Sequence, residues 1–439
     1  MTELTACAKS ECDLFESATV QTTILGDNTI TLKPVASLDN NTQLEFFYGG
    51  GAADMYLDLS RTYLRLKLSL SKSGDTAATA GSPSVPEWKT GFVNNVLFSL
   101  FSQCEVYINE TNITTSTSDY YNYKCMIQNL LNYSPEAGST HLYSAGFALD
   151  IKADGTTNGL LATTDNKGWE RRLAPFKEGR SVVLHSRIQG DIFDQPKLIP
   201  AGCDFRIRLV FADSDFYLYT NIDNSTSKVT LLDASLFLRQ VQVNPSTVIA
   251  HNRVLAKRNA VFPMKKSEIK TYSIPRDVNG FNLHNVYTGV LPDLLVIGFV
   301  EQDAFHGTIK KNPYHFKDLG LTSLSVYVNG LERKVEDFKF GVSGNWAAAY
   351  SAFYEGIGIH RMNEGRMITY DMYGHNYTLF AFDLTPDGSG HTQHTSVKQI
   401  GNIRIHGSMA TLTTTVTCIV YAEFSSVMEI DNYRKPVVL

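Results

Sequence analysis

The sequence has few of the residues on which disulfide scaffolds and membrane spans depend. Its 439 residues include six cysteines, three tryptophans and 14 prolines. The cysteines are scattered and form no Cys-X-X-Cys pair, which indicates reduced thiols rather than a disulfide framework. They are Cys7, Cys12, Cys104, Cys125, Cys203 and Cys418. The longest apolar run, residues 96–101, is broken by Ser99 and is far too short to cross a bilayer.

Positive charge is also scarce. The formal net charge is −5, and lysine and arginine occur at most in pairs such as Lys265-Lys266. Nucleic-acid-binding proteins usually carry a basic stripe, so we expect no direct, sequence-specific binding of nucleic acid. Residues 1–16 are polar and acidic and do not resemble a signal peptide. Together with the reduced cysteines, this predicts a soluble protein that is not secreted.

Common catalytic motifs are missing from the sequence. It contains neither Gly-X-Ser-X-Gly nor His-Glu-X-X-His. His391 and His394 form the one close histidine pair, but a zinc site would need two further ligands on a rigid backbone. Gly49-Gly50-Gly51 lacks the following Lys-Ser/Thr of a phosphate-binding loop, so we interpret it as a turn. We therefore expect no enzyme, with no catalytic, cofactor-binding or metal-binding residues and no cofactor.

Carboxylates are plentiful, but sequence alone does not pair them for acid–base work. Examples are Asp213, Asp215, Glu355 and Asp383. A carbohydrate-binding or glycan-processing double β-sandwich therefore stays open as an alternative. Such a protein would need a groove with aromatic platforms and paired carboxylates.

What the sequence does contain is the pattern of β-strands. It has 22 tyrosines and 24 phenylalanines, and along residues 63–70 leucines alternate with polar residues. Further strands are predicted at residues 44–48, 92–109, 181–192, 205–211, 229–243, 294–300, 377–383, 400–405 and 413–424. Helices are predicted at residues 120–132, capped by Ser118 or Asp119, and at residues 347–354. We expect Tyr120, Tyr121 and Tyr123 to pack onto a sheet rather than to form a ligand box.

One strand ending occurs twice. Val106-Tyr107-Ile108-Asn109 returns as Val326-Tyr327-Val328-Asn329, 220 residues later. Asparagine suits the positive φ of a tight turn, so both stretches are predicted to end in a turn. A repeated unit of this spacing indicates an internal duplication. Many short strands and long loops, twice over, predict an all-β fold of two eight-stranded jelly rolls.

The domain limits follow from the same patterns. Residues 1–40 show few core signals and are predicted to be an N-terminal arm, with one strand near residues 21–25 or 29–32. The polar, turn-rich residues 221–227 suggest the boundary between a first jelly roll, 41–224, and a second, 225–430. Residues 431–439 form a predicted tail. The loops 71–86 and 154–166 are expected to face solvent or neighbouring subunits.

Several stretches resemble the major capsid proteins of Polinton (Maverick) elements and adintoviruses, and the matches span roughly residues 44–431. The most specific are Tyr377-Thr378-Leu379-Phe380-Ala381-Phe382-Asp383-Leu384-Thr385-Pro386-Asp387 and Val420-Tyr421-Ala422-Glu423-Phe424. Shorter matches include Leu97-Phe98-Ser99-Leu100-Phe101-Ser102-Gln103, Ile297-Gly298-Phe299-Val300, Ala304-Phe305-His306-Gly307 and the repeated strand ending. Residues 1–40 and 71–86 lie outside the resemblance.

The resemblance implies a double jelly roll of the adenovirus hexon lineage. It also implies a homotrimer whose six jelly rolls form a pseudo-hexameric tile of an icosahedral virion shell. The implied partners are further copies of the chain and a single-jelly-roll penton protein. Assembly would take place inside the host cell, in the nucleus or the cytoplasm. A host-domesticated capsid derivative would look alike in sequence and is a further alternative.

Overall fold

The first sandwich is built from two four-stranded sheets. The structure, a computed structural model, describes residues 20–38, 42–72, 90–114, 119–152, 165–221, 227–335, 346–391 and 396–438. The first long sheet has the order β1 (Ile24–Leu32), β10 (Ser227–Val243), β3 (Met55–Lys72) and β7 (Ser181–Arg187). The first short sheet has the order β2 (Gln43–Tyr48), β8 (Phe205–Phe211), β5 (Phe101–Ile108) and β6 (Thr111–Asn112).

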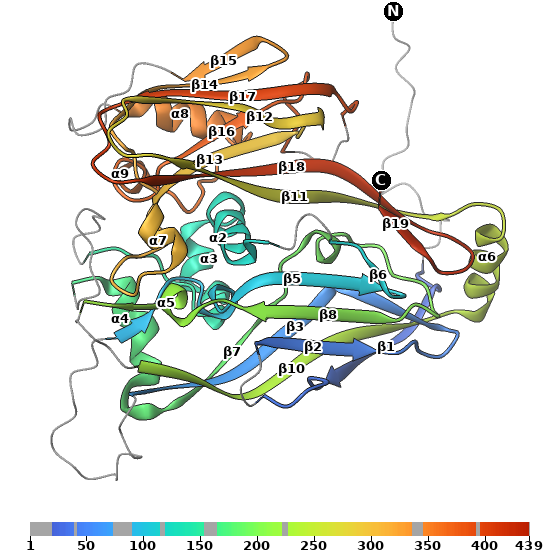
Figure 1. Cartoon of the computed structure of the whole chain (residues 1–439). Helices are drawn as coiled ribbons and strands as arrows, with labels where there is room; N and C mark the ends of the chain where they lie inside the picture. The colour runs from blue at the N-terminus through green and yellow to red at the C-terminus, as the bar shows by residue number, and fades with distance from the viewer. Residues whose placement is uncertain are drawn as a thin grey trace, which may run out of the picture.

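The second sandwich repeats this arrangement (Figure 1). The second long sheet has the order β11 (Ala260–Ile274), β18 (Val416–Ile430), β13 (Leu294–Glu301) and β16 (Leu379–Asp383). The second short sheet has the order β12 (Gly280–Val290), β17 (Ile400–Met409), β14 (Leu321–Val328) and β15 (Leu331–Val335). If the eight strands of each sandwich are counted along the chain, both sandwiches have the orders 1-8-3-6 and 2-7-4-5. The predicted double jelly roll is therefore confirmed, and with it the duplication.

The helices and minor strands lie in the connections of this frame. Figure 1 shows α2 and α7 between the two sandwiches and α6 at one end, where the chain passes from one sandwich to the other. Their bounds are α1 (Val96–Ser99), α2 (Tyr121–Asn132), α3 (Pro135–Ser139), α4 (Lys167–Leu173), α5 (Ser214–Tyr217), α6 (Pro245–Leu255), α7 (Gln302–His306), α8 (Ala347–Gly356) and α9 (Tyr370–Tyr373). β4 (Thr90–Phe92) pairs with β9 (Leu218–Thr220).

The leucine alternation of β3 buries one face of the strand, as predicted. Leu64, Leu66, Leu68 and Leu70 are at most 1% exposed, while Tyr63 and Lys67, which alternate with them, are exposed. β18 is buried on both faces from Val416 to Ala422 because the first sandwich covers its far side. A single cluster of buried apolar side chains contains residues of both sandwiches. The two halves therefore share one core.

The repeated strand ending is the same turn in both sandwiches. Asn109 and Asn329 have φ of 45° and 51°, in the left-handed region that asparagine tolerates. The Asn109 Oδ1 accepts the backbone N–H of Asp204 at 2.6 Å, and the Asn329 Oδ1 accepts that of Asn402 at 3.0 Å. The backbone N–H of each asparagine also donates to the backbone carbonyl of the same partner, Asp204 for Asn109 and Asn402 for Asn329. The motif thus ties the end of the fourth strand to the start of the seventh.

The tyrosine of the motif also has the same neighbour in both copies. Tyr107 lies opposite Arg206 in the strand register, and Tyr327 lies opposite Arg404. The guanidinium carbons stand 4.5 Å and 4.2 Å from the ring centroids, within cation–π range. The arginines were not part of the sequence argument, because only the strand register reveals this pairing.

The structure corrects the predicted domain boundary. β10, at residues 227–243, pairs with β1 and β3 and is the eighth strand of the first sandwich. The predicted limit at residues 224/225 therefore cuts through the connection leading into the last strand of the first sandwich, because polar turn residues mark any loop and not only loops between domains. The chain leaves the first sandwich in α6. Residues 222–226 themselves lie outside the described part.

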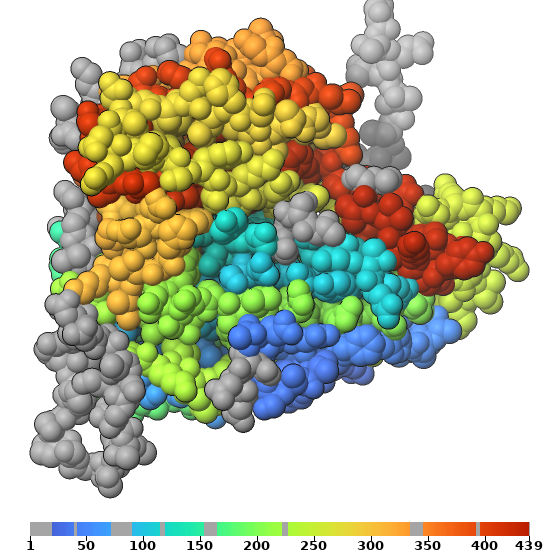
Figure 2. Space-filling view, in the orientation of Figure 1, coloured from blue at the N-terminus to red at the C-terminus, as the bar shows by residue number. Residues whose placement is uncertain are grey.

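Both ends of the described chain belong to the sheets rather than forming free extensions. Within the predicted arm, residues 24–32 are β1, which pairs with β10 over its whole length. Within the predicted tail, β19 (Pro436–Val438) pairs with β18. Arg434 donates to the Ala201 carbonyl and to Asn252 Oδ1, at 2.9 Å each, and accepts from Asn109 Nδ2 through its own carbonyl. In Figure 2 the C-terminal residues and α6 lie side by side at one end of the molecule.

Candidate functional site

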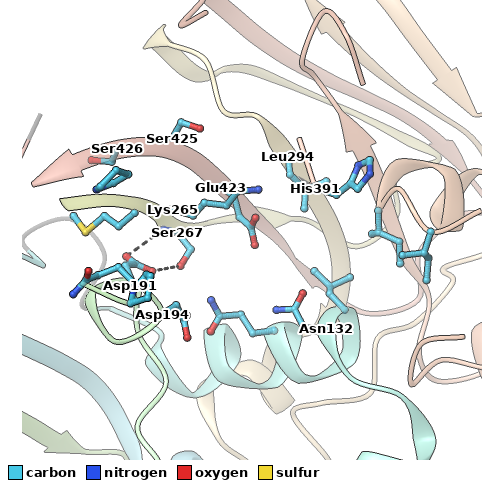
Figure 3. Close-up of a pocket in the computed structure, with 18 of the residues that line it drawn as sticks. Asn132, Asp191, Asp194, Lys265, Ser267, Leu294, His391, Glu423, Ser425 and Ser426 are labelled. Atoms are coloured by element: carbon cyan, nitrogen blue, oxygen red, sulfur yellow. Dashed lines mark hydrogen bonds between the residues drawn. The ribbon is translucent and has the colours of Figure 1, made fainter. Parts of the chain in front are cut away.

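The junction between the two sandwiches contains a buried ion pair that is shared by both. Lys124 of α2 and Asp191 are 5% and 6% exposed, and the Lys124 Nζ lies 2.7 Å from the Asp191 Oδ1. Ser267 of β11 donates to Asp191 from its hydroxyl at 2.7 Å and from its backbone N–H at 3.2 Å, as Figure 3 shows. Burial alone would lower the pKa of Lys124, but Asp191 outweighs it and holds that pKa above its usual value. The ammonium therefore stays charged.

A second buried ion pair lies elsewhere in the junction. Arg172 of α4 contacts Asp150 at 2.7 Å, and both side chains are at most 1% exposed. Asn312, which follows α7 in the second sandwich, donates to the other carboxylate oxygen at 2.7 Å. Burial would raise the pKa of Asp150, but Arg172 and His315 lower it below its ordinary value. The second sandwich thus supplies hydrogen-bond donors to the buried carboxylates of both pairs, which belong to the first sandwich.

Aromatic side chains fill the space beside these pairs. Tyr123 of α2 makes ring contacts with Phe216, Phe305 and Tyr314, with centroids 5.4–5.6 Å apart. Its hydroxyl donates to the Pro313 carbonyl at 3.0 Å. Tyr121 and Tyr123 are 2% and 1% exposed, so both are buried, but the rings around Tyr123 come from α5, α7 and Tyr314 rather than from the predicted sheet.

The predicted helix at the start of this cluster is correct, but its cap is not. The N-cap residue of α2 is Tyr120, with φ of 56°. Asp119 instead accepts a hydrogen bond from Gln103 Nε2 at 2.8 Å. Ser118 lies outside the described residues. Similarly, residues 96–99 of the predicted 92–109 strand region form α1 before β5 begins.

A cleft of about 610 Å³ opens between α2, β11 and β18. Figure 3 shows the Glu423 carboxylate directed into it, with Asp191, Asp194 and Lys265 around it. Burial raises the pKa of Glu423, although Tyr421 donates to its carboxylate at 2.6 Å. Asp191 is held by Lys124 and Ser267, and Asp194 by Arg187. Of these carboxylates, Asp191 therefore bonds across the junction, whereas Asp194 and Glu423 have their partners within their own sandwiches.

Among the candidate residues named from the sequence, two pairs are neighbours in the structure. His391 lies 3.9 Å from Asp383, whose carboxylate also accepts from Thr385 and Gly390; His394 is outside the described residues. Asp213 caps α5 by accepting from the N–H of Asp215. Within the described ranges, no group of three His, Cys, Asp or Glu side chains is arranged to hold a metal ion. In the same ranges, no helix has the length and apolar character needed to span a membrane.

The described cysteines are buried and reduced. They are Cys104, Cys125, Cys203 and Cys418. Burial raises the pKa of Cys104 and of Cys203 to about 12, which keeps these thiols protonated and unreactive at neutral pH. They serve as core residues. Cys7 and Cys12 lie outside the described residues.

Comparison with known proteins agrees with this architecture. No protein-family model matches the chain. An uncharacterised protein of Caenorhabditis elegans is 22% identical over 414 residues, which are 92% of this chain and 96% of that protein. A chain in the structure of the Sputnik virophage is 12% identical with a TM-score of 0.64, and the match covers 99% of this chain and 93% of that one.

The crystal structure of the mavirus major capsid protein gives a similar match. It is 10% identical with a TM-score of 0.52, covering 100% of this chain and 96% of that one. At these identities the likeness concerns the fold, and it extends over the whole of both chains. The chain is therefore a double jelly roll of the kind found in viral major capsid proteins.

Proposed function

We propose that the chain is a major capsid protein, which forms homotrimers that tile an icosahedral shell. The observation that carries the proposal is the identical strand order of the two sandwiches, held as one unit by a buried junction. Three copies of such a unit supply six similar sandwiches, so a three-fold ring presents six similar edges. Tiles of that outline pack hexagonally.

The finer assignments rest on the sequence resemblance. It places the chain with the Polinton and adintovirus capsid proteins of the hexon lineage, which assemble inside the host cell. A single-jelly-roll penton protein would then fill the five-fold positions. The net charge of −5 supports a shell that encloses its genome without binding it through this chain.

A second candidate follows from the animal relative. A nematode protein matches this chain over almost its whole length. A host-domesticated capsid derivative that keeps the double jelly roll for another binding role would give the same match. Such a derivative need not form closed shells.

The solution mass of the purified chain tests the proposal. We expect three times the 48.8 kDa mass of one chain, and particles of hexagonal outline in images of the same fraction. A trimer that forms shells when concentrated supports a capsid protein, and a trimer that never does so supports the domesticated derivative. A monomer under all conditions would contradict both and favour the glycan-binding alternative, for which a glycan array is the direct assay.

A further inference from the structure

The two long sheets occupy equivalent places in their sandwiches, but among the described residues only the second is covered on its outer face, the face directed away from its own core. Tyr421, Ile419 and Val296 share that face in the register and are at most 1% exposed. Helix α2 of the first sandwich lies against this face. Gln128 donates to the Tyr421 hydroxyl at 3.4 Å, and Lys124 forms an ion pair with Asp191, which also accepts a hydrogen bond from Ser267. Of the outer faces of the two long sheets, the one in the second sandwich is thus buried within the chain.

The outer face of the first long sheet is open in the described part of the chain. Tyr63 on β3 is 38% exposed, and Val183 on the edge strand β7 is 53% exposed. Tyr63 stacks on His185 with centroids 5.2 Å apart and planes within 4°. Phe237 meets the edge of His185 at 5.6 Å, and Arg65 lies over the Phe237 ring at 5.2 Å. Aromatic rings with an arginine are the composition typical of an interface centre.

The covering element also has an equivalent in the second sandwich. α2 and α8 both lie between the fifth and sixth strands of their sandwiches. α2 is buried almost all round, whereas α8 exposes Ala347, Ala348, Ser351 and Glu355 along one side. The small side chains allow a helix to lie close to a sheet face. The exposed Glu355 is opposite in charge to the exposed Lys67 on the first long sheet, where Arg65 is already paired with Asp233 at 3.4 Å.

We propose that the open face of the first long sheet binds the exposed side of α8 in a second copy of this chain. The contact repeats between copies the arrangement that α2 and the second long sheet make within one copy. The contact joins two different surfaces, the open sheet face of one copy and α8 of the next. Because every copy carries both surfaces, the copies close into a ring in which first and second sandwiches alternate. This inference rests on the proposed function, since it names the surfaces through which the trimer closes.

Cross-linking between copies tests the geometry directly. The parent has Cys7→Ser and Cys12→Ser, and the four remaining cysteines are buried. Val183→Cys and Ser351→Cys are made singly in this parent and mixed under mild oxidation. We expect a disulfide-linked pair of chains in the mixture and none from either variant alone. Linkage from Val183→Cys alone would mean a two-fold contact of like surfaces and would overturn the proposal.

Charge placed on either surface tests the contact by a different route. Val183→Glu and, separately, Ser351→Arg are expected to weaken trimer formation about tenfold or more while leaving the thermal midpoint of the monomer unchanged. Val290→Glu, of similar exposure at 45% but on the second short sheet, is the matched control. A wild-type trimer that both variants leave intact, without the 183–351 cross-link, would sink this inference and leave the proposed function standing. A monomeric wild type would refute the proposed function itself.

Discussion

At the scale of single residues, the buried charges of the junction differ in their effect on stability. Asp150 and Asp191 are matched by a cation and by donors from the opposite sandwich. Glu423 is buried with a hydroxyl partner, and burial raises its pKa. The ionised form of Glu423 is therefore less favourable in the folded chain than in the unfolded chain. This penalty is fully present above the folded pKa and disappears as pH falls below the ordinary value of a glutamate.

Glu423→Gln removes that penalty. We expect it to raise the free energy of unfolding by about 1 kcal/mol at pH 8 and to change it little near pH 4. Thermal unfolding at both pH values measures the difference, with Glu364→Gln as the control because that side chain is 75% exposed. A variant less stable than wild type at pH 8 would show that the carboxylate supports the junction rather than straining it.

At the scale of elements, the repeated hairpins show what the shared motif is for. Asparagine supplies the left-handed backbone and an amide oxygen that closes onto the seventh strand, while tyrosine supplies a ring for the arginine on that strand. The two turns differ in their surroundings. The Asn109 amide also donates to the Arg434 carbonyl at 2.6 Å, and so connects the first hairpin to the C-terminal hairpin.

Alanine substitution of the two asparagines should reflect this difference. Asn329→Ala is expected to lower the free energy of unfolding by about 1–2 kcal/mol. Alanine tolerates a positive φ less well than asparagine, and it has no amide oxygen to accept the backbone hydrogen bond. Asn109→Ala should cost more, since it also releases Arg434. Glycine at either position keeps the backbone conformation and should cost less than alanine. Chemical denaturation of the four variants gives the order, and equal losses at 109 and 329 would remove the role assigned to Arg434.

At the scale of the whole molecule, the two sandwiches form one unit. Their apolar side chains belong to one cluster, and the second sandwich contributes hydrogen-bond donors to buried carboxylates of the first. A sandwich on its own would expose Tyr421, Ile419 and Val296 or leave Asp191 with fewer donors. Independent folding of the halves is therefore disfavoured.

We accordingly expect one cooperative unfolding transition. With Trp88→Phe, variants that keep only Trp169 or only Trp346 report on the first and the second sandwich, and their fluorescence curves should coincide. Lys124→Met leaves Asp191 buried without its cation and should cost about 3–5 kcal/mol, against a negligible effect of the exposed Lys398→Met. Two separated transitions in the wild type would show that the junction does not couple the sandwiches.

Although it did not indicate β11, β12 or α6, the sequence by itself determined most of the other strands, the duplication and the helices α2 and α8. These depend on local patterns, such as the leucine alternation in β3 and the Val-Tyr-Ile/Val-Asn ending of β5 and β14, which any short window displays. Only the tertiary structure decided where the first sandwich ends, because β10 belongs to it through pairing with β1 and β3, which are distant in sequence. The same holds for Asp191, Asp150 and Ser267, whose roles depend on which residues of the other half face them. Pairing between distant strands and the matching of buried charges are set by the packed chain, so no local pattern records them.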